Sequence, residues 1–186
     1  KGFYLISDDV DVLLKGLGWG VSFVQLRDKH ASKEAIYQKA TDFQARKPKT
    51  DIPFIINDFL DIAKAVDADG LHTGQDDLPV DVLRSIWGDH KLLGRTTHDF
   101  SQGEVAVDQG ADYVSVGPIW ETPSKPNRDG IGFDYLQKAD TLGVPFVAIG
   151  GINSDLIDEV MAFDPPLVGV IRDYESIPRL MGQYFS

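Results

Sequence analysis

The stretch DIPFIINDFLDIAKAVDADGLHTGQDDLP, residues 51–79, predicts a strand, a helix and a second strand in succession. Residues 53–56 form a short apolar run, residues 59–66 have a helical composition, and residues 69–72 are a second strand candidate. Two strands that are joined through a helix run parallel in one sheet. This stretch therefore predicts an α/β fold with a parallel sheet.

The same alternation extends over the whole chain of 186 residues. Eight strand candidates alternate with eight helix candidates, which predicts a closed (β/α)8 TIM barrel with short loops; an open doubly wound sheet is the alternative. The length suits a single catalytic domain, residues 1–186. Strands are expected at residues 3–6, 22–26, 53–56, 69–72, 91–94, 112–116, 145–149 and 167–171. Helices are expected near residues 9–17, 31–46, 59–66, 79–87, 101–109, 133–141, 153–163 and 175–184, with Asp58, Ser101 and Ser154 as capping or first-turn residues.

The composition narrows the classes of partner. A formal charge of -11 argues against a nucleic acid or an anionic membrane, because both require a cationic surface. No apolar run approaches the roughly 18 residues that a membrane span needs. The chain has no cysteine, which removes disulfides, zinc–thiolate sites and thiol nucleophiles and agrees with a cytoplasmic protein. Small molecules are therefore the expected partners, and any anion would be bound by a few local cationic side chains.

In a barrel of this kind the functional groups lie at the carboxyl ends of the strands. Strand alternation puts Gln25 and Arg27 on one face of the second strand, with Lys29 following at its end. Such a polar row suits a polyanion, since arginine binds it as a fork and lysine as a point charge. The structural alternative is an ion pair between arginine and aspartate that caps the barrel end.

Two carboxylates, Asp58 and Asp77, follow the third and fourth strands, beside the amide of Asn57. Mg²⁺ characteristically takes one or two carboxylates together with substrate oxygens and water. The two residues therefore predict a magnesium site next to the cationic row. The alternatives are that Asp58 only caps the next helix and that Asp77 is a turn residue.

A second anion site is expected after the seventh and eighth strands, the usual phosphate site of such barrels. There the glycine pair 150–151 permits close approach of a phosphate, and Arg172 is placed either to bind it or to pair with Asp173. After the fifth strand, GRTTH (residues 94–98) offers Thr96 as a contact and His98 as an acid, a base or simply a packed residue.

The loop in VGPIWETPSKPNRDGIG, residues 116–132, carries two hydroxyls and a lysine, Thr122, Ser124 and Lys125. Prolines at 123 and 126 stiffen it, and glycines at 130 and 132 would allow it to close over a site. The loop lies between the two anion sites in the sequence. It is therefore expected to bridge two anionic ligands.

The segments VQLRDK, INDFLDIAKAVDADGLHTGQDDLP, GRTTH, GADYVSVGPIWETPSKP and AIGGIN together resemble the thiamine phosphate synthase family, in that family's order and over nearly the whole chain. The resemblance implies a (β/α)8 barrel and a transferase of thiamine biosynthesis. Such an enzyme joins hydroxymethylpyrimidine diphosphate to thiazole phosphate, releases pyrophosphate and uses Mg²⁺. Family members often carry Ser at position 96, Thr at position 124 and Ser near position 172; the first two differences retain a hydroxyl.

The resemblance also implies roles for individual residues. It assigns Mg²⁺ to Asp58 and Asp77, and catalysis, as stabilisation of the departing pyrophosphate, to Arg27, Lys29 and Lys125. The pyrimidine diphosphate would be held by Gln25, Arg27, Lys29, Asn57, Thr96 and Lys125. The thiazole phosphate would be held by Thr122, Ser124, Gly151, Ile171 and Arg172.

Two rival functions are considered. A thiazole tautomerase shares the fold and a G-R-x-x-H stretch, but its pattern lacks the aspartate pair and the Gln-Asp-Asp turn. A non-catalytic phosphate-binding barrel would not need the complete set of diphosphate, metal and second phosphate positions. Asp58 and Asp77 therefore favour the synthase.

Overall fold

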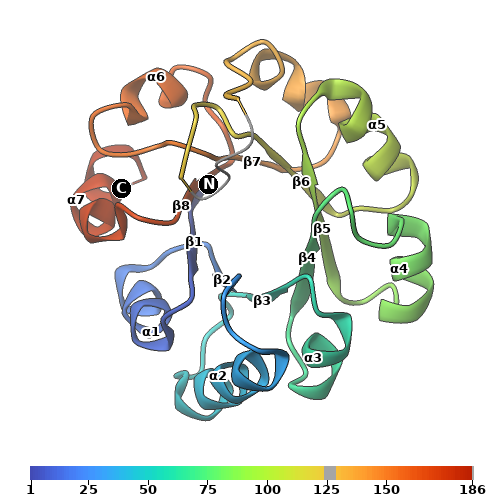
Figure 1. The fold of residues 1–186 in the computed structure, drawn as a ribbon. Coiled ribbons are helices and arrows are strands. Elements are labelled where there is room, and N and C mark those ends of the chain that lie inside the picture. The colour runs from blue at the N-terminus through green and yellow to red at the C-terminus, as the bar shows by residue number, and fades with distance from the viewer. Residues whose placement is uncertain (124–128, 186) are drawn as a thin grey trace.

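The computed structural model describes residues 1–123 and 129–185 and contains a closed barrel of parallel strands in the order β1 to β8 (Figure 1). Each strand pairs in parallel with its neighbours in the sequence, and β8 pairs with β1. The predicted (β/α)8 barrel is therefore confirmed. The strands are β1 (Gly2–Ser7), β2 (Phe23–Leu26), β3 (Phe54–Asn57), β4 (Gly70–Thr73), β5 (Leu92–Thr97), β6 (Tyr113–Val116), β7 (Phe146–Ala148) and β8 (Leu167–Val170).

Helices surround the barrel on the outside (Figure 1). Within the described residues, no helix is long and apolar enough to cross a bilayer. The helices are α1 (Val10–Trp19), α2 (Lys33–Arg46), α3 (Leu60–Ala65), α4 (Val80–Trp87), α5 (Phe100–Asp108), the 3₁₀ helix η1 (Leu136–Leu142), α6 (Ile157–Met161), the 3₁₀ helix η2 (Tyr174–Ser176) and α7 (Ile177–Tyr184).

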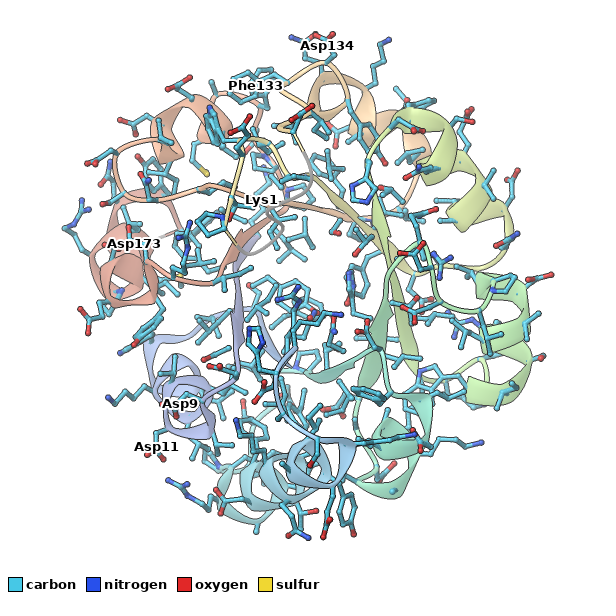
Figure 2. All side chains as sticks on the ribbon, in the orientation of Figure 1. Lys1, Asp9, Asp11, Phe133, Asp134 and Asp173 are labelled. Atoms are coloured by element: carbon cyan, nitrogen blue, oxygen red, sulfur yellow. The ribbon has the colours of Figure 1, made fainter. Side chains whose placement is uncertain are left out.

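Strand alternation divides the core into two layers. Side chains point both into the barrel and outward to the helices (Figure 2). The inner layer contains Tyr4, Ile6, Ile55, Tyr113, Val147 and Leu167. The outer layer is larger and includes Phe3, Leu5, Phe54 and Ile56, which are fully buried. Because neighbouring residues of one strand enter different layers, a polar residue on the inner face faces the barrel interior and its mouth.

The strand predictions differ from the structure by a few residues at their ends. The largest difference is in β5, which was expected at residues 91–94 but continues to Thr97 because Thr96 and Thr97 pair with Ser115 and Val116 of β6. Thr96 is consequently a strand residue rather than a loop residue. The backbone pairing between β5 and β6 therefore fixes the position of Thr96.

The helix predictions were less accurate in the second half of the chain. The helix expected at residues 133–141 is the 3₁₀ helix η1, which ends at Gly143 in a left-handed conformation shortly before β7 begins. The helix expected at 153–163 is only the five residues of α6, and the one expected at 175–184 is divided into η2 and α7.

Of the three residues predicted as caps or first-turn residues, only Ser101 is one, because it lies in the first turn of α5. Asp99, rather than Ser101, caps α5 by accepting a hydrogen bond from the Gln102 N–H at 2.8 Å. Asn153 accepts from the N–H groups at 155 and 156, while the N–H of Ser154 donates to Asp173. The third residue, Asp58, precedes Phe59, the N-cap of α3, and makes no cap; its backbone is left-handed, with a φ of 66°.

Candidate active site

Polar residues from several strands meet in one cavity at the carboxyl end of the barrel. Six site residues predicted from the sequence are part of its wall: Gln25 and Arg27 from β2 and its end, Asn57 from β3, Thr96 from β5, Thr122 after β6, and Ile171 after β8. The cavity encloses about 490 Å³, including the part open to solvent. The polar row predicted on the second strand thus faces the same space as polar groups of β3 and β5.

A cationic depression adjoins this cavity. Arg27 lines both, and it shares the depression with Lys29 and Arg172; two carboxylates, Asp8 and Asp9, also line the depression. Burial lowers the pKa of Arg27, and the nearby charge of Asp58 opposes that effect. An ion pair between Arg27 and an aspartate, the structural alternative, is not among the described ion pairs; the adjacent Asp28 pairs with Lys39 at 2.7 Å. A partly desolvated arginine beside a lysine suits an anionic ligand.

Asp58 directly follows β3 and has a left-handed backbone conformation. Its N–H donates to the His72 carbonyl of β4 at 2.8 Å. Its carboxylate forms an ion pair with Lys29. Asp77 lies in the loop between β4 and α4, where its Oδ2 accepts a hydrogen bond from the Gly74 N–H at 2.7 Å. Asp77 is therefore also a turn residue, which the sequence analysis gave as the alternative to a metal ligand.

The two carboxylates are electrostatically coupled. Burial raises the pKa of Asp77; the Gly74 N–H opposes this effect and the charge of Asp58 adds to it. The described residues contain no group of three or more His, Cys, Asp or Glu side chains that could hold a metal. Two neighbouring carboxylates fit Mg²⁺, which commonly takes one or two protein carboxylates and completes its shell with substrate oxygens and water.

The raised pKa of Asp77 predicts a stability cost at neutral pH. Since folding disfavours the ionised form, the cost is present above the raised pKa and absent below the pKa of the unfolded chain. We expect Asp77→Asn to raise the melting temperature at pH 7, with the gain disappearing toward about pH 3 as the unfolded-state carboxyl becomes protonated. Thermal unfolding over a pH series measures this, with Asp76→Asn as a control that removes the same charge from the same loop. A variant less stable than the wild type at pH 7 would contradict the prediction.

The glycine-rich anion site predicted after β7 and β8 is also a depression. Thr122, Gly151, Ile171 and Arg172 line it together with Gly150. Both glycines have positive φ, 101° and 74°, and the Arg172 Nη2 donates to the Thr122 hydroxyl at 3.4 Å. The pairing of Arg172 with its neighbour in sequence is not among the described ion pairs; the carboxylate of Asp173 instead accepts from Ser154 and Ser176.

Two predicted site residues, Ser124 and Lys125, lie outside the described residues, so their roles stay predictions. The segment that follows is attached to the barrel, because the N–H of Ile131 donates to the Pro118 carbonyl at 2.8 Å. His98, for which a direct role was left open, has its Nδ1 2.6 Å from the Gly117 carbonyl. It thus contacts the backbone at the start of the loop after β6.

Sequence reasoning missed four polar residues of the barrel interior: Tyr4, His72, Tyr113 and Ser115, all of them buried. His72 is part of the cavity wall. The sequence did contain a pattern that could have identified His72, because a histidine at an inward position of a barrel strand is as unusual as the glutamine of β2.

Comparisons with known proteins agree with this geometry. The sequence matches the family described as thiamine monophosphate synthase over residues 3–173. It is 47% identical over 144 residues to a thiamine-phosphate synthase of Halalkalibacterium halodurans, covering 76% of this chain and 68% of that protein. It is 40% identical over 173 residues to the thiamine-phosphate synthase of Shouchella clausii, covering 92% and 83%.

Among solved structures, the chain is similar to a thiamine phosphate pyrophosphorylase from Pyrococcus furiosus, with a TM-score of 0.87 and 26% identity. That similarity covers 100% of this chain and 97% of the other. The sequence match takes in all eight strands of the barrel. The chain therefore belongs to the thiamine monophosphate synthase family.

Proposed function

We propose that this chain is a Mg²⁺-dependent thiamine-phosphate synthase that couples hydroxymethylpyrimidine diphosphate with thiazole phosphate, forming thiamine phosphate and pyrophosphate. As a member of the family, it is a transferase of the thiamine-phosphate synthase type. The substrates, the metal and the roles of individual residues are the parts that we add. One observation supports the pairing of two substrates: the central cavity and the glycine-rich depression share wall residues, among them Thr122 and Gly150, so two anionic ligands could lie in contact.

The reaction breaks a carbon–oxygen bond to pyrophosphate and forms a carbon–nitrogen bond to the thiazole. Departure of pyrophosphate would leave a cation that the pyrimidine ring stabilises, and the thiazole nitrogen would then attack it. Such a reaction depends on positioning and on stabilising the charge of the leaving group more than on a protein nucleophile. Arg27, Lys29 and Lys125 would bind the oxygens of the departing pyrophosphate.

The remaining residues would hold the two substrates against each other. Gln25, Asn57 and Thr96, which line the cavity, would bind the pyrimidine part. At the other side, the phosphate of the thiazole would lie against the backbone at Gly151 and the guanidinium of Arg172. The loop residues Thr122 and Ser124 would contact the same phosphate.

Asp58 and Asp77 would hold Mg²⁺, which when bound supplies positive charge to the oxygens of the pyrophosphate. In the structure, Lys29 pairs with Asp58 and also lines the cationic depression with Arg27. Lys29 thus lies between the proposed metal ligand and the proposed diphosphate site. The cytoplasmic location expected from the sequence stays a prediction.

The tautomerase and the non-catalytic barrel are not favoured, because the relatives described above are named thiamine-phosphate synthases. The direct test is to mix the protein with both substrates and Mg²⁺ and to measure thiamine phosphate by fluorescence after oxidation. We expect product only when all three are present, and loss of product after chelation of the metal. Folded protein that forms no thiamine phosphate would contradict the proposed function.

A further inference from the structure

A continuous series of hydrogen bonds crosses the inside of the barrel beneath the cavity. The Gln25 Nε2 donates to the Tyr4 hydroxyl at 2.7 Å, and the hydroxyls of Tyr4 and Tyr113 are 2.8 Å apart. The Tyr113 hydroxyl lies 3.1 Å from His72 Nδ1, and His72 Nε2 lies 3.0 Å from the Thr96 hydroxyl. The series thus connects two residues of the cavity wall through three residues that the reaction scheme above does not use.

The series is enclosed and closely fitted. Tyr4 and Tyr113 are 1% and 3% exposed, and His72 is 6% exposed. In the sheet register Gly94 of β5 lies between His72 of β4 and Tyr113 of β6. A Cβ at Gly94 would lie 2.1 Å from Tyr113 Cζ and 2.5 Å from His72 Nδ1. The missing side chain of β5 is therefore what allows Tyr113 to reach across that strand to the imidazole.

Counting hydrogens gives the series a direction. Burial raises the pKa of both Tyr4 and Tyr113, so each hydroxyl keeps its single hydrogen at neutral pH. Among the hydrogen bonds of the described residues, the Tyr4 hydroxyl contacts only Gln25, which donates to it, and Tyr113. Tyr4 must therefore donate to Tyr113, and Tyr113 in turn donates to His72 Nδ1. His72 then carries its hydrogen on Nε2 and donates to Thr96.

We propose that Tyr4, Tyr113 and His72 are positioning residues that hold Gln25 and Thr96 in fixed hydrogen-bonding states for the pyrimidine ring. With the direction derived above, Gln25 keeps its Oε1 as an acceptor for a ligand, and Thr96 keeps its hydroxyl hydrogen as a donor. The ring nitrogens of a pyrimidine are acceptors, so a donor held in one orientation favours one placement of the ring. This inference rests on the proposed function, since it concerns the pyrimidine substrate.

Tyr113→Phe tests the proposal, because it removes the central hydroxyl and keeps the ring. We expect the Kd for hydroxymethylpyrimidine diphosphate, measured by calorimetry, to rise about tenfold. This is roughly the net free energy of one hydrogen bond, lost because Gln25 and Thr96 are no longer held in one orientation. The KM for thiazole phosphate should change less than about twofold, since that site lies on the other side of the cavity. Tyr4→Phe should behave in the same way, and thermal unfolding shows whether both variants are folded.

Tyr135→Phe is the matched control. The Tyr135 hydroxyl is also buried and lies 2.7 Å from the Thr97 hydroxyl, which faces away from the cavity. We expect this variant to bind the diphosphate as the wild type does. Equal weakening in the Tyr135 and Tyr113 variants would assign the effect to general stability and overturn the proposal, as would unchanged binding in folded Tyr113→Phe and Tyr4→Phe.

The direction has its own readout, which needs no turnover. In ¹⁵N-histidine-labelled wild type at about pH 8, where an ordinary imidazole is neutral, His72 should have Nε2 protonated and Nδ1 unprotonated. Tyr113→Phe should remove this preference. If His72 of the wild type carries its hydrogen on Nδ1, the proposed direction of the hydrogen-bond series is wrong, even if the enzyme is active. A wild type that forms no thiamine phosphate would instead contradict the proposed function, and the spectrum would still decide the direction.

Discussion

Asp58→Asn is expected to lower kcat about a thousandfold while leaving the fold intact. A metal that neutralises charge on a leaving group contributes several kcal/mol, and each 1.36 kcal/mol corresponds to a factor of ten. Asparagine is the suitable replacement because it tolerates the left-handed backbone that Asp58 adopts. Alanine should remove activity equally but would add backbone strain at the same position. Steady-state kinetics over a range of Mg²⁺ concentrations measures the effect, and circular dichroism checks the fold.

Asp67→Asn provides the control for this variant. Asp67 also has a positive φ, 50°, and its carboxylate pairs with Lys91 at 2.6 Å, but it precedes β4 and therefore lies at the opposite end of the barrel. We expect wild-type turnover and an unchanged Mg²⁺ dependence. Undiminished activity in Asp58→Asn would reject the metal assignment, and an equal loss in both variants would show that the lost charge matters only for the fold.

Gly150→Ala is expected to have the largest effect on stability. The residue has a φ of 101°, and an added Cβ would lie 2.4 Å from the Pro118 Cα, a backbone atom that cannot move aside easily. A left-handed conformation costs an ordinary residue about 1–2 kcal/mol, and overpacking adds about 1–3 kcal/mol. A total of about 3 kcal/mol corresponds to a fall in Tm of roughly 10 °C for a chain of this size.

The same substitution should affect one substrate more than the other. Gly150 lines both the central cavity and the glycine-rich depression, so a displaced backbone there changes the proposed phosphate site. We expect the KM for thiazole phosphate to rise about tenfold, the effect of losing roughly one hydrogen bond to an anion. Gly143→Ala is the control, because Gly143 has a φ of 77° with nothing within 4 Å of an added Cβ. Gly143→Ala should lose only the stability cost of the left-handed backbone, about 1–2 kcal/mol, with kinetics unchanged. An equal loss of stability in the two variants would contradict the packing argument.

The prediction of the site from sequence succeeded where strand alternation was enough. Gln25 and Arg27 were expected on one face of a strand, and both line the same cavity. Alternation is a local property of an extended chain, so it survives without knowledge of the neighbouring strands. The failures were of a different kind. Asp58 was correctly placed at the end of a strand, but its left-handed backbone and its ion pair with Lys29 depend on contacts between β3, β4 and the loop after β2.

The starts of α1 to α5 were predicted to within two residues, but the capping side chains and the helices after β6 were predicted less well. Capping depends on the direction in which the backbone enters the helix, and this direction is set by the strand before it. Thus Asp99 caps α5 although Ser101 is closer to the helical pattern, and Asn153 acts where Ser154 was expected. Similarly, the connection between β6 and β7 contains the seven-residue 3₁₀ helix η1 in place of the helix expected at residues 133–141.

Local sequence is enough to predict the alternation of strands and helices, the barrel, and the end of the barrel at which polar residues gather. These properties follow from short-range periodicity and from the rule that strands joined through helices run parallel. Which polar groups meet depends on the folded barrel. Tyr4 of β1 and Tyr113 of β6 are far apart in the chain and belong to strands that are not neighbours, yet their hydroxyls are 2.8 Å apart because closure of the barrel turns both inward. No local pattern contains that distance, since it depends on the register of all eight strands at once.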